Sequence, residues 1–417
     1  METQAATPGP PPIALRDIRV KTAAAGGTPD RVPFIPTTNN FNALHYGLSI
    51  EAVMRDNRVL IPAFLQYLKD YDPDYAYLPG FFPIDAMETA GYTNARWPGP
   101  YYGLPEDTPY QFVDASYLQE EDYEPFLRDP SAFLIQKVLT KKYKNFPGLA
   151  FLSAPCLAGQ SILSLAPLGL PPVRETLMNM IKAGEQVQDA LGKMTELAMA
   201  AVKAGYPVFG ASVVLNPFDD FADNVRGLID TCMDIVNDPA LVLEAAMRWG
   251  DATIPSAVML AKMAHQEMVF VPLHCGMENF MSIENYQKVY WPPLKRLLNA
   301  LIEAGLTPFV FCEGKYSNRL ETIADVPAGK VIYAFEDVDF KRAKAILGGR
   351  ACIAGGMPTQ MLMEGGRPET VRDQVRRMLD ICAPGGGYIM SNSLALDHCE
   401  RALMEAWHEA VLEYGQY

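Results

Sequence analysis

Acidic, histidine and cysteine side chains follow two apolar stretches in the second half of the chain. His274 and Cys275 come directly after Met268–Leu273, and Glu313 comes directly after Pro308–Cys312. A carboxylate at the end of a buried strand is costly unless it is paired or used. We therefore predict Glu313 and His274 as catalytic residues that act as acid, base or metal ligand.

The same residue types could also bind a metal ion. Imidazole, thiolate and carboxylate groups are zinc ligands, so Glu313, His274 and Cys275 form a candidate zinc set. Neighbouring residues of a regular strand point to opposite faces, and the histidine and cysteine could share one ion only where the loop has turned. A structural histidine is the alternative. Tyr316 and Arg319 follow Glu313 and are predicted to bind substrate, Arg319 through a carboxylate.

Polar residues also follow the first apolar run of the chain. They include His45 as a candidate acid or base, and Asn40 and Tyr46 as candidate substrate contacts. Helix capping and turn formation are the alternative roles for the asparagines of this segment. Asn392 follows a late strand beside glycines that permit close approach of a ligand, and it is predicted to bind substrate as well; tight turns are the alternative for the glycines.

Short β-rich runs alternate with segments of helical periodicity from Arg31 onward. This pattern is typical of parallel strands joined by helices, and it predicts an α/β fold of the (β/α)8 TIM-barrel type. Active residues of such barrels lie at the carboxyl ends of the strands. The clearest helices are Pro239–His265, Ser282–Ala304 and Pro368–Ile381. The candidate strands, one more than a barrel needs, are Val32–Pro36, Tyr75–Leu78, Leu149–Leu152, Val208–Val214, Met268–Leu273, Pro308–Cys312, Lys330–Phe335, Ala351–Ala354 and Tyr388–Ser391.

The chain divides into an arm and one large domain. Residues 1–30 are rich in Pro, Ala and Gly and predict a surface arm that packs on a second subunit of a homodimer, while residues 31–417 form the barrel. Residues 79–148 are too long for an ordinary connection and predict an inserted lid or substrate loop. A packing flap is the alternative.

Composition excludes several classes of partner. The 417 residues carry a formal net charge of -14, which repels nucleic acid. Seven cysteines without regular spacing favour a reducing compartment, and we expect the cytoplasm. The first residues lack the pattern of a signal peptide, and no apolar run is long enough to predict a membrane span.

The order of motifs in the second half resembles the uroporphyrinogen decarboxylase superfamily. The segment from Leu273 to Gly314 combines a Gly loop, a serine before a helix and the sequence Pro-Pro-Leu-Lys-Arg, and it is followed by Gly-Gly-Met-Pro and Gly-Gly-Gly-Tyr-Ile-Met-Ser-Asn-Ser. The similarity extends over residues 31–417 as an ordered set. It implies a TIM barrel, and the segment Asp325–Val331 is similar to a subgroup that carries only the superfamily name.

Two branches of this superfamily differ in their motifs. The haem-pathway decarboxylases carry an Arg-rich motif near the amino terminus, but this chain has no arginine between Arg31 and Arg55. The cobalamin-linked methyltransferases carry a His-x-Cys zinc motif. Here Phe311 and Glu313 stand at the histidine and first cysteine of that motif, with about Ser393 at the last cysteine, so the thiolate motif is not kept.

The resemblance therefore favours a corrinoid-linked methyltransferase. We expect it to move a methyl group between a small O- or N-methyl compound and a cobalamin carried by a separate corrinoid protein, with Glu313, or a zinc ion held there, assisting the leaving group. The first alternative is a decarboxylase of an aromatic or tetrapyrrole acid. The second is a ligand-binding barrel without catalysis.

Overall fold

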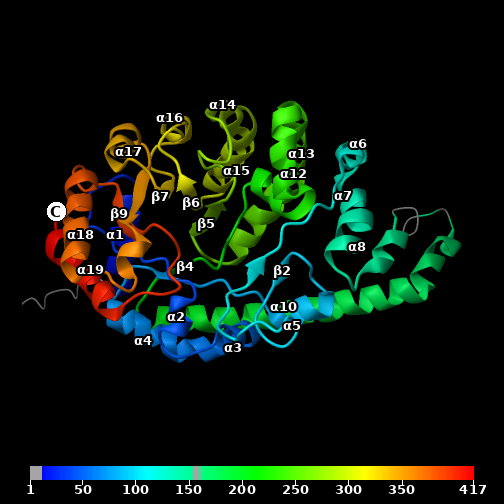
Figure 1. The fold of residues 1–417 in the computed structure, drawn as a ribbon, viewed down its shortest axis with the longest axis horizontal. Coiled ribbons are helices and arrows are strands. Elements are labelled where there is room, and N and C mark those ends of the chain that lie inside the picture. The colour runs from blue at the N-terminus through cyan, green and yellow to red at the C-terminus, as the bar shows by residue number, and fades with distance from the viewer. Residues whose placement is uncertain (1–11, 154–158, 160) are drawn as a thin grey trace, which may run out of the picture.

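The computed structural model describes residues 12–153, 159 and 161–417, and its centre is a parallel sheet (Figure 1). The strands lie in the order β5-β6-β7-β8-β9, which is also their order along the chain. Helices connect each strand to the next, as parallel pairing requires. The predicted α/β fold is confirmed. The strands are β5 (Met268–Leu273), β6 (Thr307–Lys315), β7 (Ile332–Asp337), β8 (Cys352–Met357) and β9 (Tyr388–Asn392).

Two shorter pairings extend this arrangement. Strands β1 (Ala76–Tyr77) and β4 (Val208–Phe209) pair in parallel. Isolated parallel bridges join Val213 to Phe270 of β5 and Phe34 to Met390 of β9. The amide of Asp74 donates to the carbonyl of Phe34 at 2.8 Å, which links the first apolar run to the segment before β1.

Side chains of the sheet alternate between two apolar clusters. The side chains on one face of the sheet, including Phe309, Phe311 and Ile332, pack against one another in a first cluster. The other face, with Val310 and Cys312, packs against the surrounding helices. Each strand is therefore buried on both sides, which explains its continuous apolar sequence. The covering helices include α15 (Trp291–Glu303), α16 (Leu320–Ile323), α17 (Phe340–Leu347), α18 (Pro368–Cys382) and α19 (Arg401–Tyr414).

Part of the predicted arm is a helix, α1 (Pro12–Ala24), which packs on the chain's own sheet. Its Val20 is fully buried in the same cluster as Phe309 and Phe311. Arg19 of α1 and Arg31 both pair with Asp74, which has no exposed surface. These ion pairs hold α1 and the segment around Arg31 against the segment before β1.

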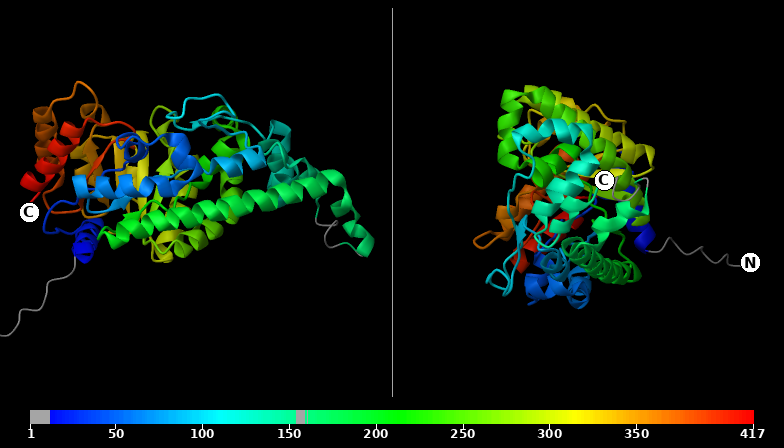
Figure 2. Two further views of the ribbon diagram at one scale, coloured as in Figure 1. Left: turned by 90° about the horizontal axis from the view of Figure 1, so that it is seen from below. Right: turned by 90° about the vertical axis from the view of Figure 1, so that its right-hand side faces the viewer.

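The predicted insertion is largely helical and lies beside a long helix. Its elements are α5 (Ile84–Ala90), the antiparallel strands β2 (Ala95–Arg96) and β3 (Gln111–Phe112), η2 (Glu120–Asp122), α6 (Tyr123–Arg128), α7 (Pro130–Phe133), the π-helical η3 (Leu134–Val138) and α8 (Leu139–Lys142). Figure 2 shows α10 (Pro171–Lys203) running along much of the molecule's length beneath them. In the described part of the chain, no helix is both long enough and apolar enough to cross a membrane.

Further short elements complete the chain. They are α2 (Phe41–Leu44), α3 (Ile50–Arg55), η1 (Asn57–Leu60), α4 (Ile61–Tyr71), η5 (Ile162–Gly169), α11 (Pro217–Phe221), the π-helical η6 (Ala222–Arg226), α12 (Leu228–Asn237), α13 (Pro239–Met263), α14 (Ile283–Asn285), the π-helical η7 (Tyr286–Tyr290) and η8 (Thr359–Leu362).

One predicted strand is wrong. Leu149–Leu152 lies mostly in a 3-10 helix, η4 (Pro147–Phe151). Gly148 in this helix packs directly against the backbone of Pro172 and Val173 at the start of α10. The run Val32–Pro36 forms no strand of the sheet and joins it by one isolated bridge, from Phe34 to Met390. The remaining predicted strands overlap β1, β4 and β5 to β9.

The Asp74 cluster gives a test of stability. Replacing Asp74 with Ala leaves Arg31 largely buried without its carboxylate, so we expect the free energy of unfolding to fall by about 3 kcal/mol or more. Denaturant unfolding of the variant measures this. Glu124→Ala, which removes a pair exposed on α6, is the control and should change little. Equal effects of the two substitutions would contradict this role of Asp74.

Candidate active site

The carboxyl ends of β5 and β6 bring two predicted catalytic residues together. His274 follows β5 directly, and Glu313 continues the face of β6 that carries Phe309 and Phe311. The imidazole Nε2 of His274 lies 3.7 Å from Oε1 of Glu313, and both side chains are about one-third exposed. Solvent and a ligand can therefore reach a pair that is otherwise enclosed by protein.

A bulge in β6 fixes the position of Glu313. The register between β6 and β7 shifts between Cys312 and Lys315. Gly314 within the shift has a φ of 69°, and its amide donates to Oε2 of Glu336 at 2.6 Å. A Cβ at Gly314 would also meet Met277 at 2.8 Å, so this position favours glycine.

His274 is held by a carboxylate from the helix that follows β4. Its Nδ1 lies 2.7 Å from Oδ2 of Asp223, in the π-helical segment η6, and this contact leaves Nε2 directed to Glu313. Burial alone would lower the pKa of His274. The hydrogen bond to Asp223 and the charges of Asp219 and Glu313 outweigh burial and raise this pKa to about 9. His274 is therefore a cation at neutral pH.

Asp219 fixes the turn that presents His274. It lies on α11 with no exposed surface, and its carboxylate accepts from the backbone amides of His274 and Cys275 at 3.3 and 2.9 Å. The hydroxyl of Tyr290 also donates to it at 2.6 Å. Burial raises the pKa of Asp219. Three donors from two other elements thus compensate for burying this carboxyl group.

Glu313 is set to exchange a proton near neutral pH. Its pKa is raised to about 7, first by burial and then by the charges of Asp219, Glu336 and Asp223, against the opposing charge of His274. A carboxyl group that is partly protonated at pH 7 can both donate and accept a proton. Together with the fixed imidazolium, it forms an acid-base pair at the end of two parallel strands.

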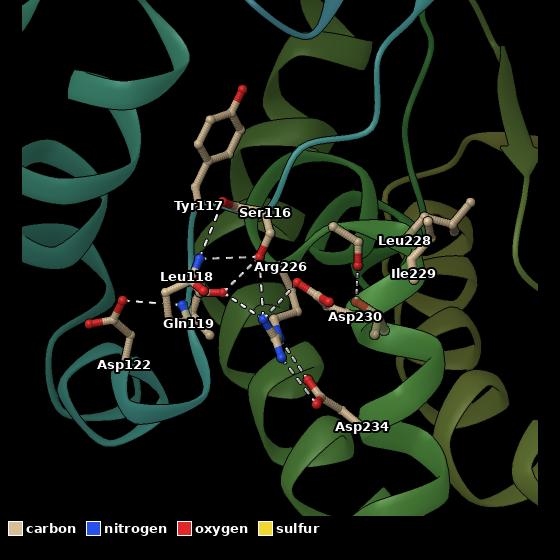
Figure 3. A network of polar contacts seen from close by, with 12 residues as sticks. Ser116, Tyr117, Leu118, Gln119, Asp122, Arg226, Leu228, Ile229, Asp230 and Asp234 are labelled. Atoms are coloured by element: carbon tan, nitrogen blue, oxygen red, sulfur yellow. Dashed lines mark hydrogen bonds and ion pairs between the residues drawn. The ribbon is translucent and has the colours of Figure 1, made fainter.

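Arg226 anchors the segment that carries Asp223 (Figure 3). Its guanidinium donates to Asp234 of α12 at 2.7 Å and to the carbonyl of Leu118 in the insertion at 2.9 Å. It also pairs with Asp230 at 3.0 Å. The insertion is thereby tied to the same helical segment that positions His274.

The predicted zinc set does not fit this geometry. The thiol of Cys275 has no exposed surface and belongs to the apolar cluster that faces the helices, whereas His274 turns to Glu313. Burial raises the pKa of this thiol well above its ordinary value. Within residues 12–153, 159 and 161–417, no three or more His, Cys, Asp or Glu side chains are grouped to hold a metal ion.

Arg319 and Tyr316 lie beneath the loop rather than at the acid-base pair. The guanidinium of Arg319 is fully buried and donates to the carbonyls of Gly276, Met277 and Met281. Tyr316 is also fully buried. The Nε and Nη2 donors of Arg319 hold the loop that follows His274, and its Nη1 is buried without a partner, so the structure gives no support to the predicted carboxylate contact.

His45, Asn40 and Tyr46 form a separate group. His45 stacks on Phe41 with ring centroids 4.6 Å apart, and burial together with Arg401 lowers its pKa. Asn40 donates to Asp397 at 3.0 Å, and the hydroxyl of Tyr46 donates to Asp70 at 3.0 Å. These contacts hold α2 against α4 and the segment after β9. They do not join the Glu313–His274 pair.

Asn392 bridges the first and last segments of the sheet. Its side-chain amide donates to the carbonyl of Thr37 at 3.0 Å, and its side-chain oxygen accepts from the amide of Thr37 at 2.8 Å. Asn392 thus replaces a backbone partner for the first apolar run. These contacts hold the backbone of Thr37 and give no support to the predicted role of Asn392 in binding substrate.

Asp219, Asp223 and Glu336 are functional candidates that the sequence analysis missed. A signal for the first two was present, because the sequence Phe-Asp-Asp-Phe-Ala-Asp at 218–223 follows the predicted strand Val208–Val214 and alternates acids with apolar residues. Its acids follow a strand end in the same way as His274 and Glu313. Glu336 gave a signal too, because it directly follows the predicted strand Lys330–Phe335, as Glu313 follows Pro308–Cys312.

The charge of His274 can be measured directly. With five histidines in the chain, the imidazole proton resonances can be assigned by substitution, and His274 should titrate near pH 9. Its pKa exceeds the ordinary 6.5, so the pair stabilises the fold fully below pH 6.5 and this contribution is lost as pH rises through about 9. Asp223→Asn should lower the midpoint. A midpoint near 6.5 in the unmodified protein would contradict the described contacts.

Comparison with known proteins places this geometry in a family. A solved methyltransferase from Methanosarcina mazei is similar in fold, with a TM-score of 0.63 and 12% identity over 96% of this chain and 98% of its own. No curated protein matches the chain in sequence. The model of the family described as uroporphyrinogen decarboxylase (URO-D) matches residues 171–396, a range that includes Asp219, Asp223, His274 and Glu313. This match covers more than half of the chain, which therefore belongs to the uroporphyrinogen decarboxylase (URO-D) family.

Proposed function

We propose that the chain is an enzyme that transfers a methyl group from a small O- or N-methyl compound to a corrinoid carried by a separate protein. The observation that carries this proposal is the Glu313–His274 pair, in which a carboxyl group with a pKa of about 7 lies 3.7 Å from an imidazolium. When the methyl carbon leaves, the oxygen or nitrogen that held it keeps the bonding electrons and needs a proton. Glu313 supplies that proton, and His274 lies beside the carboxylate that remains.

The corrinoid would supply the nucleophile that accepts the methyl group. Exposed aromatic rings near the site offer the macrocycle an apolar surface, because Phe82 and Tyr110 are 50% and 39% exposed and pack edge to face with centroids 4.9 Å apart. Tyr110 lies close enough to Glu313 for its pKa to be raised by that charge, after burial. The partner protein would therefore dock over the insertion beside the carboxyl ends of β5 and β6.

We also infer that the strands close into a (β/α)8 barrel. Backbone contacts support closure on both sides of the five-stranded sheet, since Val213 bridges β4 to β5 and Phe34 bridges to β9. The remaining links are the pairing of β1 with β4 and the hydrogen bond from the amide of Asp74, before β1, to the carbonyl of Phe34. In such a barrel Glu313 and His274 stand at the mouth, where active sites of this fold lie.

Replacement of Glu313 with Gln tests the proposed proton donor. The variant keeps the size of the side chain but cannot donate a carboxyl proton, so turnover should fall about 100-fold or more. The assay follows the visible spectrum of reduced cobalamin with a panel of methoxylated aromatics and methylamines. Glu284→Gln on α14, which removes an exposed pair with Lys288, is the matched control and should retain activity.

The pH dependence of turnover gives a second test. Because Glu313 must be protonated to act as the acid, the rate should fall as pH rises through about 7. The fall should be absent from the residual rate of Glu313→Gln. Carbon dioxide release from an aromatic acid, with no spectral change for any methylated compound, would contradict methyl transfer and favour a decarboxylase. Full activity of Glu313→Gln would remove this residue from the chemistry.

A further inference from the structure

A cavity of about 470 Å³ lies beside the acid-base site, between the insertion and α10. Its lining is mostly apolar, and it includes the aromatic rings of Phe82, Tyr92, Tyr143 and Phe146 with Met180 and Val187 of α10. The volume is within the range of pockets that bind small molecules. The polar groups that line it come chiefly from Lys142 and Asn224.

Lys142 at the end of α8 is a buried cation in this cavity. The residue is only 9% exposed, and its ammonium donates to the side-chain oxygen of Asn224 at 2.6 Å. An ammonium has three donors, so this bond leaves two. Among the described residues, no ion pair holds Lys142, although an enclosed ammonium is costly without an anion next to it. Burial lowers its pKa to about 8, and Asp220 and Asp223 oppose that shift, so the group is still mainly charged at pH 7.

Aromatic rings line the same cavity as this ammonium. The Nζ atom of Lys142 lies 5.8 Å from the centroid of the Tyr92 ring. The rings of Tyr92 and Tyr143 are 5.6 Å apart, and those of Tyr143 and Phe146 are 4.9 Å apart. Rings at these separations make a wall on which a further aromatic ring can pack.

We infer that this cavity binds an aromatic carboxylate, with the ring against Tyr92, Tyr143 and Phe146 and the carboxylate on the free donors of Lys142. One anion would complete the hydrogen bonding of the ammonium, and one flat ring would fill apolar space. An aliphatic acid would meet the same cation but would not match the aromatic wall.

The cavity adjoins the acid-base site through η6. Asn224, which binds Lys142, is the neighbour of Asp223, which binds His274. Phe82 of the lining packs on Tyr110, whose hydroxyl is influenced by Glu313. If the proposed methyl transfer is correct, on which this step rests, an aromatic acid anchored by Lys142 is the class of substrate that the site takes.

Calorimetric titration of the full chain with 2-naphthoate tests the pocket. The unmodified protein should bind it, and Lys142→Met should bind about tenfold more weakly or worse because a charge-assisted contact is lost. Lys141→Met, at the exposed neighbour whose amine donates to the carbonyl of Tyr117, is the matched control and should bind normally. The neutral 2-naphthamide should bind the unmodified protein more weakly than 2-naphthoate.

A second variant keeps the test sharp where Lys142→Met fails to fold. Ala183 lines the cavity from α10 and is 8% exposed, so Ala183→Leu should fill the space and weaken 2-naphthoate while leaving Lys142 in place. No binding by the unmodified protein, equal binding by Lys142→Met, or tighter binding of decanoate than of 2-naphthoate would each overturn the inference. Binding of 2-naphthoate without turnover of any methylated aromatic acid would uphold the pocket and count against the proposed function.

Discussion

A buried carboxylate keeps its charge only where a cation or hydrogen-bond donors stand next to it, and His274 is the cation around which this site is built. Asp219, Asp223 and Glu313 all influence its pKa. Asp223 takes the hydrogen bond to the ring, and Asp219 takes the backbone amides of the turn. Glu313 is the member of the group without such a close partner, at 3.7 Å from the ring. With its pKa raised to about 7, chiefly by burial, Glu313 can hold a proton near neutral pH.

The arrangement depends on elements that are far apart in sequence. The strand end of β5 supplies His274, the bulge of β6 supplies Glu313, and the segment η6 supplies Asp223. Arg226 ties η6 to α12 and to the insertion through hydrogen bonds. The same segment offers Asn224 to Lys142 on its other side. The acid-base pair and the aromatic cavity therefore share one structural support.

The sequence predicts the strands of the parallel sheet and two residues of the site, His274 and Glu313, for physical reasons. Strands β5 to β9 are buried on both sides, so their apolar runs stand out, and His274 and Glu313 are conspicuous because they interrupt such runs at the end. Residues whose role depends on tertiary contacts could not be assigned in this way. Arg319 has the chemistry of a carboxylate ligand, but it is buried and its Nε and Nη2 donate to three backbone carbonyls. Cys275 is adjacent to His274 but faces the helices. The aromatic cavity is lined by residues of the insertion and of α10, which are far apart in the sequence, so no local sequence pattern predicts it.

The protonation of Glu313 is the claim on which the account of the site rests most directly. Carbon-13 NMR of protein labelled at the glutamate carboxyl groups can follow it, with the Glu313→Gln spectrum used to assign the resonance. A carboxyl resonance that is absent from the variant should titrate with a midpoint of about 7. A midpoint at the ordinary value of 4.5 would contradict it, because Glu313 would then have no proton to give at neutral pH.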